Sequence, residues 1–174
     1  MKKIIYYGAM VCGLAFYIKM SIDEEREMRK IESREELQIQ ENDKSKYTDC
    51  LYYSSHMGIL PILYGIYRGK PEVALPVGIT FLTSLNYWRK PRYTWRRTID
   101  VHMSRFTVLY NIYYAAYLHG ATIHYMYIPL MSSCIALYPI GIYNYSKHRY
   151  WHFVLAHMGV HLSAALATAL SCDV

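Results

Sequence analysis

The sequence predicts an all-α integral membrane protein: a bundle of about five transmembrane helices that follows a short N-terminal anchor. Apolar residues make up 53% of the 174 residues, which a soluble domain could also carry, so their distribution decides the class. Charged residues gather in a few short segments and leave long uncharged runs between them. Runs of roughly 18 residues or more can cross a hydrocarbon core. The 20 tyrosines suit membrane interfaces, where an apolar ring with a polar tip lies at headgroup level.

The net charge of +6 could indicate a nucleic-acid-binding protein. The Lys and Arg residues instead cluster in short loops beside apolar runs, which is typical of membrane topology, so we expect no nucleic-acid partner. The four cysteines are widely spaced and form no Cys-x-x-Cys motif. Small buried hydrophobes are therefore favoured over metal ligands or disulfides.

Residues 1–20 are predicted to form a membrane anchor. Residues 4–18, "IIYYGAMVCGLAFYI", are apolar and have lysines on both sides. A secretory signal peptide has a similar length, but no small-x-small cleavage pattern follows this segment. An uncleaved anchor is favoured, with flanking lysines that reach the interface and lengthen the span; a signal peptide is the alternative.

Residues 21–49 are predicted to form a charged amphipathic connector helix. Acidic and basic residues recur at spacings of three and four, as in Glu25 and Arg29, which is typical of an exposed helix with local ion pairs. We expect other membrane or peripheral proteins to bind through residues 21–46. A partner-binding coiled coil is the alternative, but the apolar stripe is thin.

Residues 50–174 are predicted to form the bundle itself. The expected spans are residues 50–67, 73–88, 102–118, 122–143 and 151–170. Pro129 and Pro139 would kink the fourth span without breaking it, because neighbouring helices satisfy the freed carbonyls.

The short loops predict the topology. Residues 89–97 and 147–149 are rich in Lys and Arg, and two spans separate them, so both face one side, called inside. The connector falls inside by parity. The turn between the third and fourth spans and the C-terminus then lie outside, both without Lys or Arg; Lys2 and Lys3 are the exception.

With this topology, polar residues from four helices meet near the inner side. They are Ser55, His56, Ser84, Asp100, His102, His148 and His152. Ionisable groups within spans are costly and are functional candidates by default. His148 and His152 are four residues apart, so on a helix both would project from one face and could share a metal. His157 and His161 have the same spacing but would point from the opposite face, deeper in the membrane.

Structural roles are the alternative for each of these residues. Asp100 could cap the helix that follows it or neutralise Arg97, and a lone histidine is more often an interfacial hydrogen-bonding group. A di-iron centre is disfavoured, because it needs several histidine boxes on one face, and His119 and His124 would fall outside.

Four short motifs resemble a known superfamily: "YSSHMG", "SLNYW", "RRTID" and "HRYWH". They are similar, in order and side, to motifs of the CREST superfamily, which contains alkaline ceramidases and adiponectin- and progestin-type receptors. The resemblance implies a zinc ion near the inner face and hydrolysis of a lipid amide or ester. His148 and His152 would bind zinc, while Asp100, with Ser84, would act on the attacking water. Trp88 stands where the family has its first histidine, so the third ligand would be His56 or His102.

Two functions therefore follow from the sequence. The favoured one is a structural or scaffolding multi-pass membrane protein of an organellar or internal virion membrane. It would bind partners through the connector and membrane lipid or acidic protein through the basic loop. The alternative is the zinc-dependent CREST-type hydrolase, although the superfamily has seven core spans where this chain has five.

Overall fold

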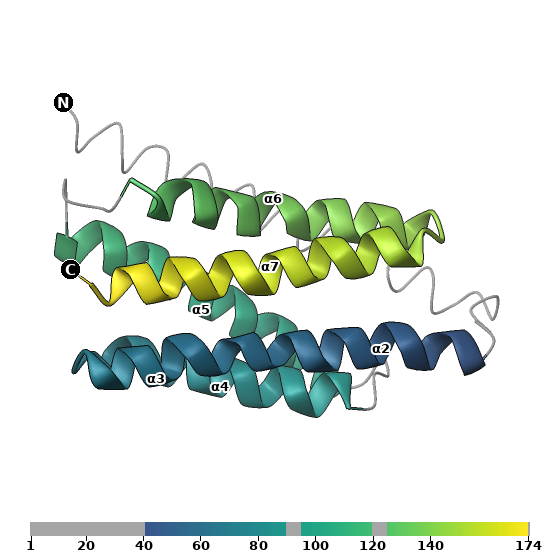
Figure 1. Ribbon diagram of the computed structural model, residues 1–174, viewed down its shortest axis with the longest axis horizontal. Coiled ribbons are helices and arrows are strands. Elements are labelled where there is room, and N and C mark those ends of the chain that lie inside the picture. Colours follow the sequence, from purple (N-terminus) through teal and green to yellow (C-terminus); the bar gives the residue numbers. More distant parts are fainter. Residues whose placement is uncertain (1–40, 90–94, 120–124, 174) are drawn as a thin grey trace. The chain divides into compact units, whose positions relative to one another are not determined.

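The computed structural model describes residues 41–89, 95–119 and 125–173. The chain divides into two units, Met1–Glu41 and Asn42–Val174, and the fold below is that of the second. Its described residues form helices joined by turns, with no strand among them (Figure 1), which confirms the predicted all-α class. The anchor, residues 1–20, and connector residues 21–40 lie outside the described residues.

The first part of the unit consists of three consecutive helical segments. The α-helix α2 (Glu41–Ser55) continues into the 3₁₀ helix η1 (His56–Gly58) and then into α3 (Ile59–Tyr67). Pro61 explains the tightened segment, because its ring has no N–H and crowds the carbonyl group of Met57, four residues before it. Helix α2 also runs through the boundary predicted at residue 49, so the end of the connector and the first span are one helix.

Four more helices complete the unit: α4 (Pro71–Trp88), α5 (Trp95–His119), α6 (Tyr127–Ser146) and α7 (Tyr150–Ser171). Pro71 begins α4, where a fixed φ and a missing N–H cost nothing. Pro139 lies inside α6, as predicted, whereas Pro129 lies in its first turn, where no helical hydrogen bond is lost. Helix α5 begins at Trp95, well before the predicted start at residue 102.

Neighbouring helices pack along their lengths. Helix α6 packs along α7, α4 lies against both α3 and α5, and α3 also contacts α7. Small residues permit the close approach of α6 and α7, since a Cβ atom at Gly159 would lie 2.8 Å from Leu137 Cδ1. Cys134 and Cys172 are buried, free thiols in these contacts, as the sequence predicted.

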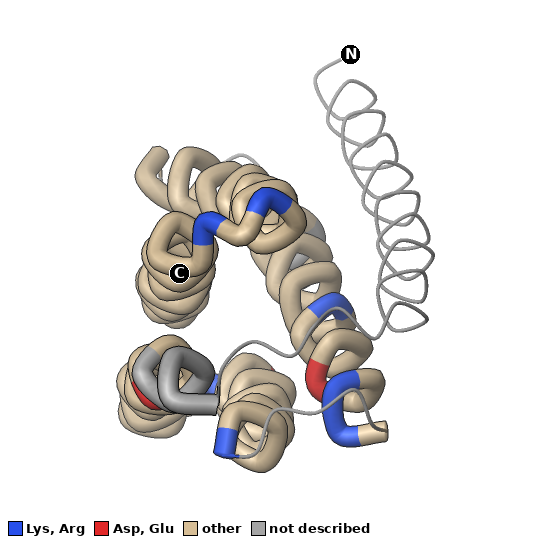
Figure 2. Tube along the Cα trace, turned by 90° about the vertical axis from the view of Figure 1, so that its right-hand side faces the viewer, with Lys and Arg blue, Asp and Glu red and all other residues tan. Residues whose placement is uncertain are grey.

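The described parts of the two basic segments lie at the same end of the unit, and the side of a membrane that they face stays a prediction. Trp88 at the end of α4 packs with Leu51 and with Val154 near the start of α7. The ring of Tyr47 contacts Tyr150 and Trp151 beside the α6–α7 turn. We call this end the basic end; Figure 2 looks onto it and shows the Lys and Arg positions in blue. Its described cations are Arg89, Arg96, Arg97, Lys147 and Arg149.

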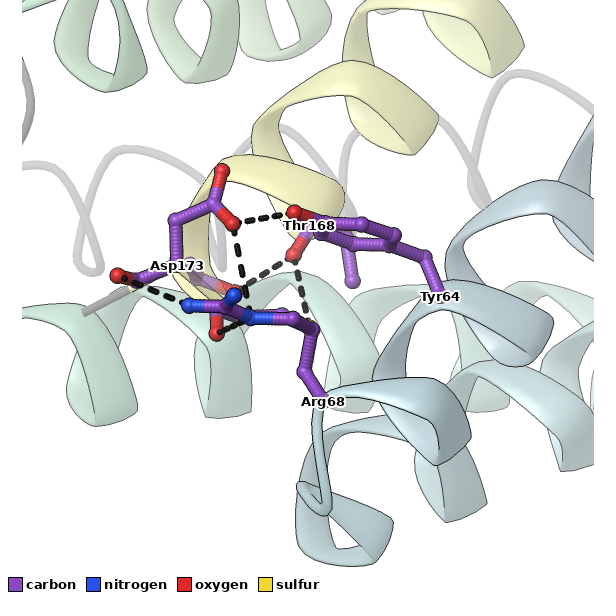
Figure 3. A network of polar contacts seen from close by, with 6 residues as sticks. Tyr64, Arg68, Thr168 and Asp173 are labelled. Carbon is purple, nitrogen blue, oxygen red and sulfur yellow. Dashed lines mark hydrogen bonds and ion pairs between the residues drawn. The ribbon is translucent and has the colours of Figure 1, made fainter.

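At the opposite end, hydrogen bonds and an ion pair join α3 and the turn after it to the C-terminal residues (Figure 3). The Tyr64 hydroxyl donates to the carboxylate of Asp173. Arg68 lies 3.6 Å from the same carboxylate and donates to the carbonyl of Cys172. These contacts fix the end of α7 against the α3–α4 turn, where Gly69 adopts a left-handed φ of 65°.

Helix α7 is the one described helix that is long and apolar enough to cross a membrane by length and composition. A core helix of a soluble protein can meet the same two criteria, so the multi-pass arrangement stays a prediction. Helices α2 and α3 fall short by length, because η1 separates them into segments of 15 and 9 residues.

Candidate functional site

Asp100 and Ser84, the two predicted catalytic residues, lie together where α4 meets α5. Ser84 Oγ donates to Asp100 Oδ1 across 2.5 Å, and Thr83 Oγ1 donates to the same oxygen across 3.3 Å. The Asp100 residue is only 7% exposed. The alternative role as a cap is wrong, because α5 begins at Trp95 and Asp100 lies in its second turn.

Burial governs the acidity of Asp100, which lies just outside the predicted span of residues 102–118. It raises the pKa of this carboxyl group to about 6, against the opposing effects of the two hydroxyl donors and Arg97. Asp100 can therefore accept and release a proton close to neutral pH, which is the property a general acid or base requires.

His148 and His152 do not form the helical pair that the sequence predicted. Helix α7 begins at Tyr150, so His148 lies in the α6–α7 turn, with a left-handed φ of 57°. Both histidines are exposed, and His148 Nδ1 lies 3.0 Å from the hydroxyl of Tyr150. The premise of two imidazoles projecting from one helix face is wrong.

The other two candidates for metal binding, His56 and His102, are also apart from a shared site. His56 Nδ1 pairs with the carbonyl of Tyr52, and its ring lies against Phe81, while His102 is exposed. No three His, Cys, Asp or Glu side chains gather to hold a metal within the described part of the chain. The described residues thus contain no set of three zinc ligands, and the zinc site stays a prediction.

A second histidine pair faces the interior: His157 and His161, for which the sequence predicted the opposite helix face from His148 and His152. His157 and His161 lie on α7 with ring centroids 4.9 Å apart. His161 Nδ1 lies 2.9 Å from Ser54 Oγ on α2, which leaves the other ring nitrogen to a further partner. Two imidazoles would supply half of a tetrahedral metal site. Their position in the middle of an uncharged run was the signal that could have identified them.

Trp88 completes the surroundings of this pair. Its indole ring lies 5.3 Å from His157, nearly perpendicular to the imidazole. The indole Nε1 is buried and has no hydrogen-bond partner. Trp88 stands where the resemblance implies a zinc-binding histidine. Its indole N–H is a hydrogen-bond donor, and its ring lies next to the histidine pair.

Further polar contacts continue along α4 and α5 from Asp100. Thr80 Oγ1 and Thr107 Oγ1 are 2.7 Å apart, and Thr107 donates to the carbonyl of Pro76 across 3.1 Å. Asn111 Nδ2 donates to the carbonyl of Thr107 across 2.9 Å. We call this row the α4–α5 seam. Its members are Glu72, Thr80, Thr83, Ser84, Asp100, Thr107, Asn111 and Tyr114.

Comparison with known proteins assigns no family to this arrangement. No family model matches the chain, and neither a curated protein nor a solved structure matches it. The resemblance to the CREST superfamily therefore stays a prediction.

The first prediction concerns Asp100→Asn. The folded-state pKa, about 6, exceeds the usual value for an unfolded chain, about 3.9, so the folded protein binds the proton more tightly. Stability is then lost as the pH rises from about 4 to 6. The asparagine variant, which cannot ionise, should gain about 1–3 kcal/mol in unfolding free energy over the wild type between pH 4 and pH 7.

The measurement is chemical denaturation in detergent at both pH values. Asp49→Asn, which removes an exposed carboxylate from α2, is the control and should show no such gain. An equal difference between wild type and Asp100→Asn at pH 4 and pH 7 would contradict the raised pKa.

Proposed function

We propose that the chain is a multi-pass integral membrane protein with a structural or scaffolding role, anchored at its basic end to anionic lipid headgroups. The observation that carries this proposal is the distribution of polarity. Large apolar side chains face away from the unit along the middle of the helices. Hydroxyl, amide and carboxyl groups lie where the helices meet.

The outward faces would be unfavourable in water. Leu82 on α4 and Leu155 on α7 are each 64% exposed, and each lies more than one turn inside its helix. Leu60, Leu63, Ile66, Leu75 and Leu166 are also exposed. Each square ångström of apolar surface removed from water is worth about 25 cal/mol, so surrounding these faces with hydrocarbon chains favours insertion.

The inward faces satisfy the other requirement of a lipid environment. A polar group inside a bilayer needs a protein partner, because no water is present to replace one. The buried polar residues of the described helices include Ser54, Ser55, Ser84, Asp100, Thr107, Asn111, Ser163, Thr168 and Ser171. Several bond across helices, as Thr80 does with Thr107 and Ser54 with His161.

Charged residues are almost confined to the helix ends. No Asp, Glu, Lys or Arg occurs in residues 50–67, 73–88, 127–146 or 150–171. Within residues 102–118, Arg105 is the single exception, and it lies near the basic end. This pattern supports a bilayer around the five passes, including those whose Tyr, Ser and Thr content lowers their hydropathy.

The basic end has the composition of a membrane interface. Trp95 and Trp151 are exposed there, the Arg96 guanidinium lies 5.7 Å from the Trp95 ring centroid, and Lys147 lies 5.8 Å from that of Tyr143. Amphipathic aromatic rings prefer the headgroup region. Each cation near an anionic surface adds about 1 kcal/mol of attraction. Partner binding through residues 21–46 stays a prediction, since nearly all of that segment lies outside the described residues.

The second prediction tests the membrane crossing. The four native cysteines are replaced by alanine, and single cysteines are introduced by Arg89→Cys, Lys147→Cys or Tyr67→Cys. In sealed vesicles of one orientation, a membrane-impermeant maleimide should label Arg89→Cys and Lys147→Cys from the same side. It should label Tyr67→Cys only after the vesicles are opened. In vesicles of the opposite orientation, it should label Tyr67→Cys at once and the other two only after opening. Labelling of all three from one side would contradict the proposal.

The third prediction tests lipid binding at the basic end. Removing two exposed cations by Lys147→Gln/Arg149→Gln should lower the ratio of phosphatidylglycerol to phosphatidylcholine retained on the purified protein by about fivefold or more. Native mass spectrometry after extraction from mixed vesicles gives this ratio. Lys147→Arg/Arg149→Lys keeps both charges and should retain the wild-type ratio; equal ratios in all three proteins would exclude anionic lipid binding there.

A further inference from the structure

The inward-facing imidazoles of α7, His157 and His161, have no use in a purely structural role. Their ring centroids are 4.9 Å apart, and both residues are half-buried, so their neighbours do not seal them off. They lie about 10 to 17 Å along the helix from its start at Tyr150. No Asp, Glu, Lys or Arg occurs in residues 150–171, so no charged side chain of this helix accounts for them.

The contacts of Ser54 determine which nitrogen of His161 carries the hydrogen. The Ser54 hydroxyl has one hydrogen and lies 3.0 Å from the carbonyl of Leu51 and 2.9 Å from His161 Nδ1. A carbonyl only accepts, so both contacts are hydrogen bonds at once only when Ser54 donates to Leu51 and accepts from a protonated Nδ1. The other nitrogen of His161, Nε2, then carries a lone pair. A histidine that binds a metal has this form, with its second ring nitrogen donating to a nearby oxygen.

His157 is surrounded by aromatic rings. The ring centroids of Trp88, Phe153 and Tyr138 lie 5.3, 5.6 and 6.5 Å from its own. Within the described part of the chain, neither ring nitrogen of His157 takes part in a hydrogen bond. A neutral imidazole has one nitrogen lone pair, so His157 supplies a second unused lone pair beside that of His161.

The indole N–H of Trp88 is the third unused polar group at this place. Trp88 is 8% exposed, and its Nε1 has no hydrogen-bond partner, although its ring lies next to His157. A buried N–H without an acceptor is costly. Two lone pairs suit a metal cation, and an N–H donor suits the oxygen of a water molecule or anion that such a cation carries. A metal ion with an oxygen ligand would therefore use all three groups.

We propose that His157 and His161 bind a divalent first-row transition-metal ion, with water or a small anion beside Trp88 as a further ligand. Imidazole nitrogen suits Zn²⁺, Cu²⁺ and Ni²⁺, and the affinity of a given site is highest for Cu²⁺. A structural zinc site has four protein ligands. Two protein ligands leave this site open, so the ion exchanges with the surroundings.

This site differs from the predicted zinc site in its ligands and in its place. His148 and His152 are exposed, and His148 lies in the turn before α7. His157 and His161 lie within α7, next to Ser54 and Trp88. Both pairs have the same spacing in the sequence, so the first pair is a matched control for the second.

The fourth prediction is that the chain binds one Cu²⁺ ion at His157 and His161. Trp95→Phe/Trp151→Phe leaves Trp88 as the single tryptophan, and bound Cu²⁺ quenches the fluorescence of a neighbouring indole. Untagged full-length protein in detergent is stripped with EDTA, freed of EDTA by dialysis and titrated with CuCl₂. We expect saturable quenching that ends at one ion per chain.

Substitutions then identify the ligands. His157→Gln and His161→Gln, which remove one imidazole each, should each raise the dissociation constant about tenfold or more. Ser54→Ala should raise it about tenfold, because the ring of His161 loses the oxygen that orients it. Circular dichroism selects the variants that fold like the wild type.

Two further measurements make the test decisive. His148→Gln/His152→Gln should bind Cu²⁺ like the wild type. Electron paramagnetic resonance of the Cu²⁺-loaded wild type requires no substitution and should show coupling to two imidazole nitrogens. No saturable quenching in the wild type, no nitrogen coupling, or an unchanged dissociation constant in His157→Gln and His161→Gln would overturn the inference. Loss of binding in His148→Gln/His152→Gln alone would also overturn it. These outcomes do not bear on the membrane crossing, which the maleimide labelling tests separately.

Discussion

Hydrogen bonds between helices, made by short polar side chains, are the constraint on which the rest of this unit depends. Asp100 is held by Ser84 and Thr83, Thr80 by Thr107, and His161 by Ser54. Each pair joins two helices and leaves the opposite faces to large apolar side chains. A unit built this way is stable where hydrocarbon covers those faces and no water competes for the inner hydrogen bonds.

Much of the fold could be predicted because uncharged runs and charged loops are local features. The end of α4 at Trp88 and the shared end of the two basic segments follow from the position of charges alone. The start of α5 was misplaced, because this helix extends into a charged segment that a membrane argument assigns to a loop. The boundary predicted at residue 49 is absent, because α2 runs through it. The 3₁₀ segment depends on how Pro61 meets the carbonyl of Met57, and a hydropathy pattern does not contain that contact.

The candidate site was predicted in part. Asp100 and Ser84 meet because α4 and α5 are antiparallel neighbours joined by a short loop, which the sequence order implies. His148 was misplaced because pairing it with His152 on one helix overlooked the loop that Lys147 and Arg149 themselves predict, and His148 lies in that turn. The inward direction of His157 and His161 depends on how α7 packs on α6 and reaches Ser54, and those contacts join residues far apart in the chain.

Nitroxide spin labels in lipid vesicles test most directly whether lipid covers the outward-facing apolar side chains. Labels replace Leu82 and Leu155, which each lie more than one turn inside a helix, or Arg89 and Lys147 at the basic end. Collision with oxygen, which concentrates in hydrocarbon, is compared with collision with a water-soluble nickel chelate. We expect high oxygen and low nickel accessibility at both leucine positions, and the reverse at the basic end. High nickel accessibility at Leu82 and Leu155 would show that water covers these faces and would contradict the proposed membrane crossing.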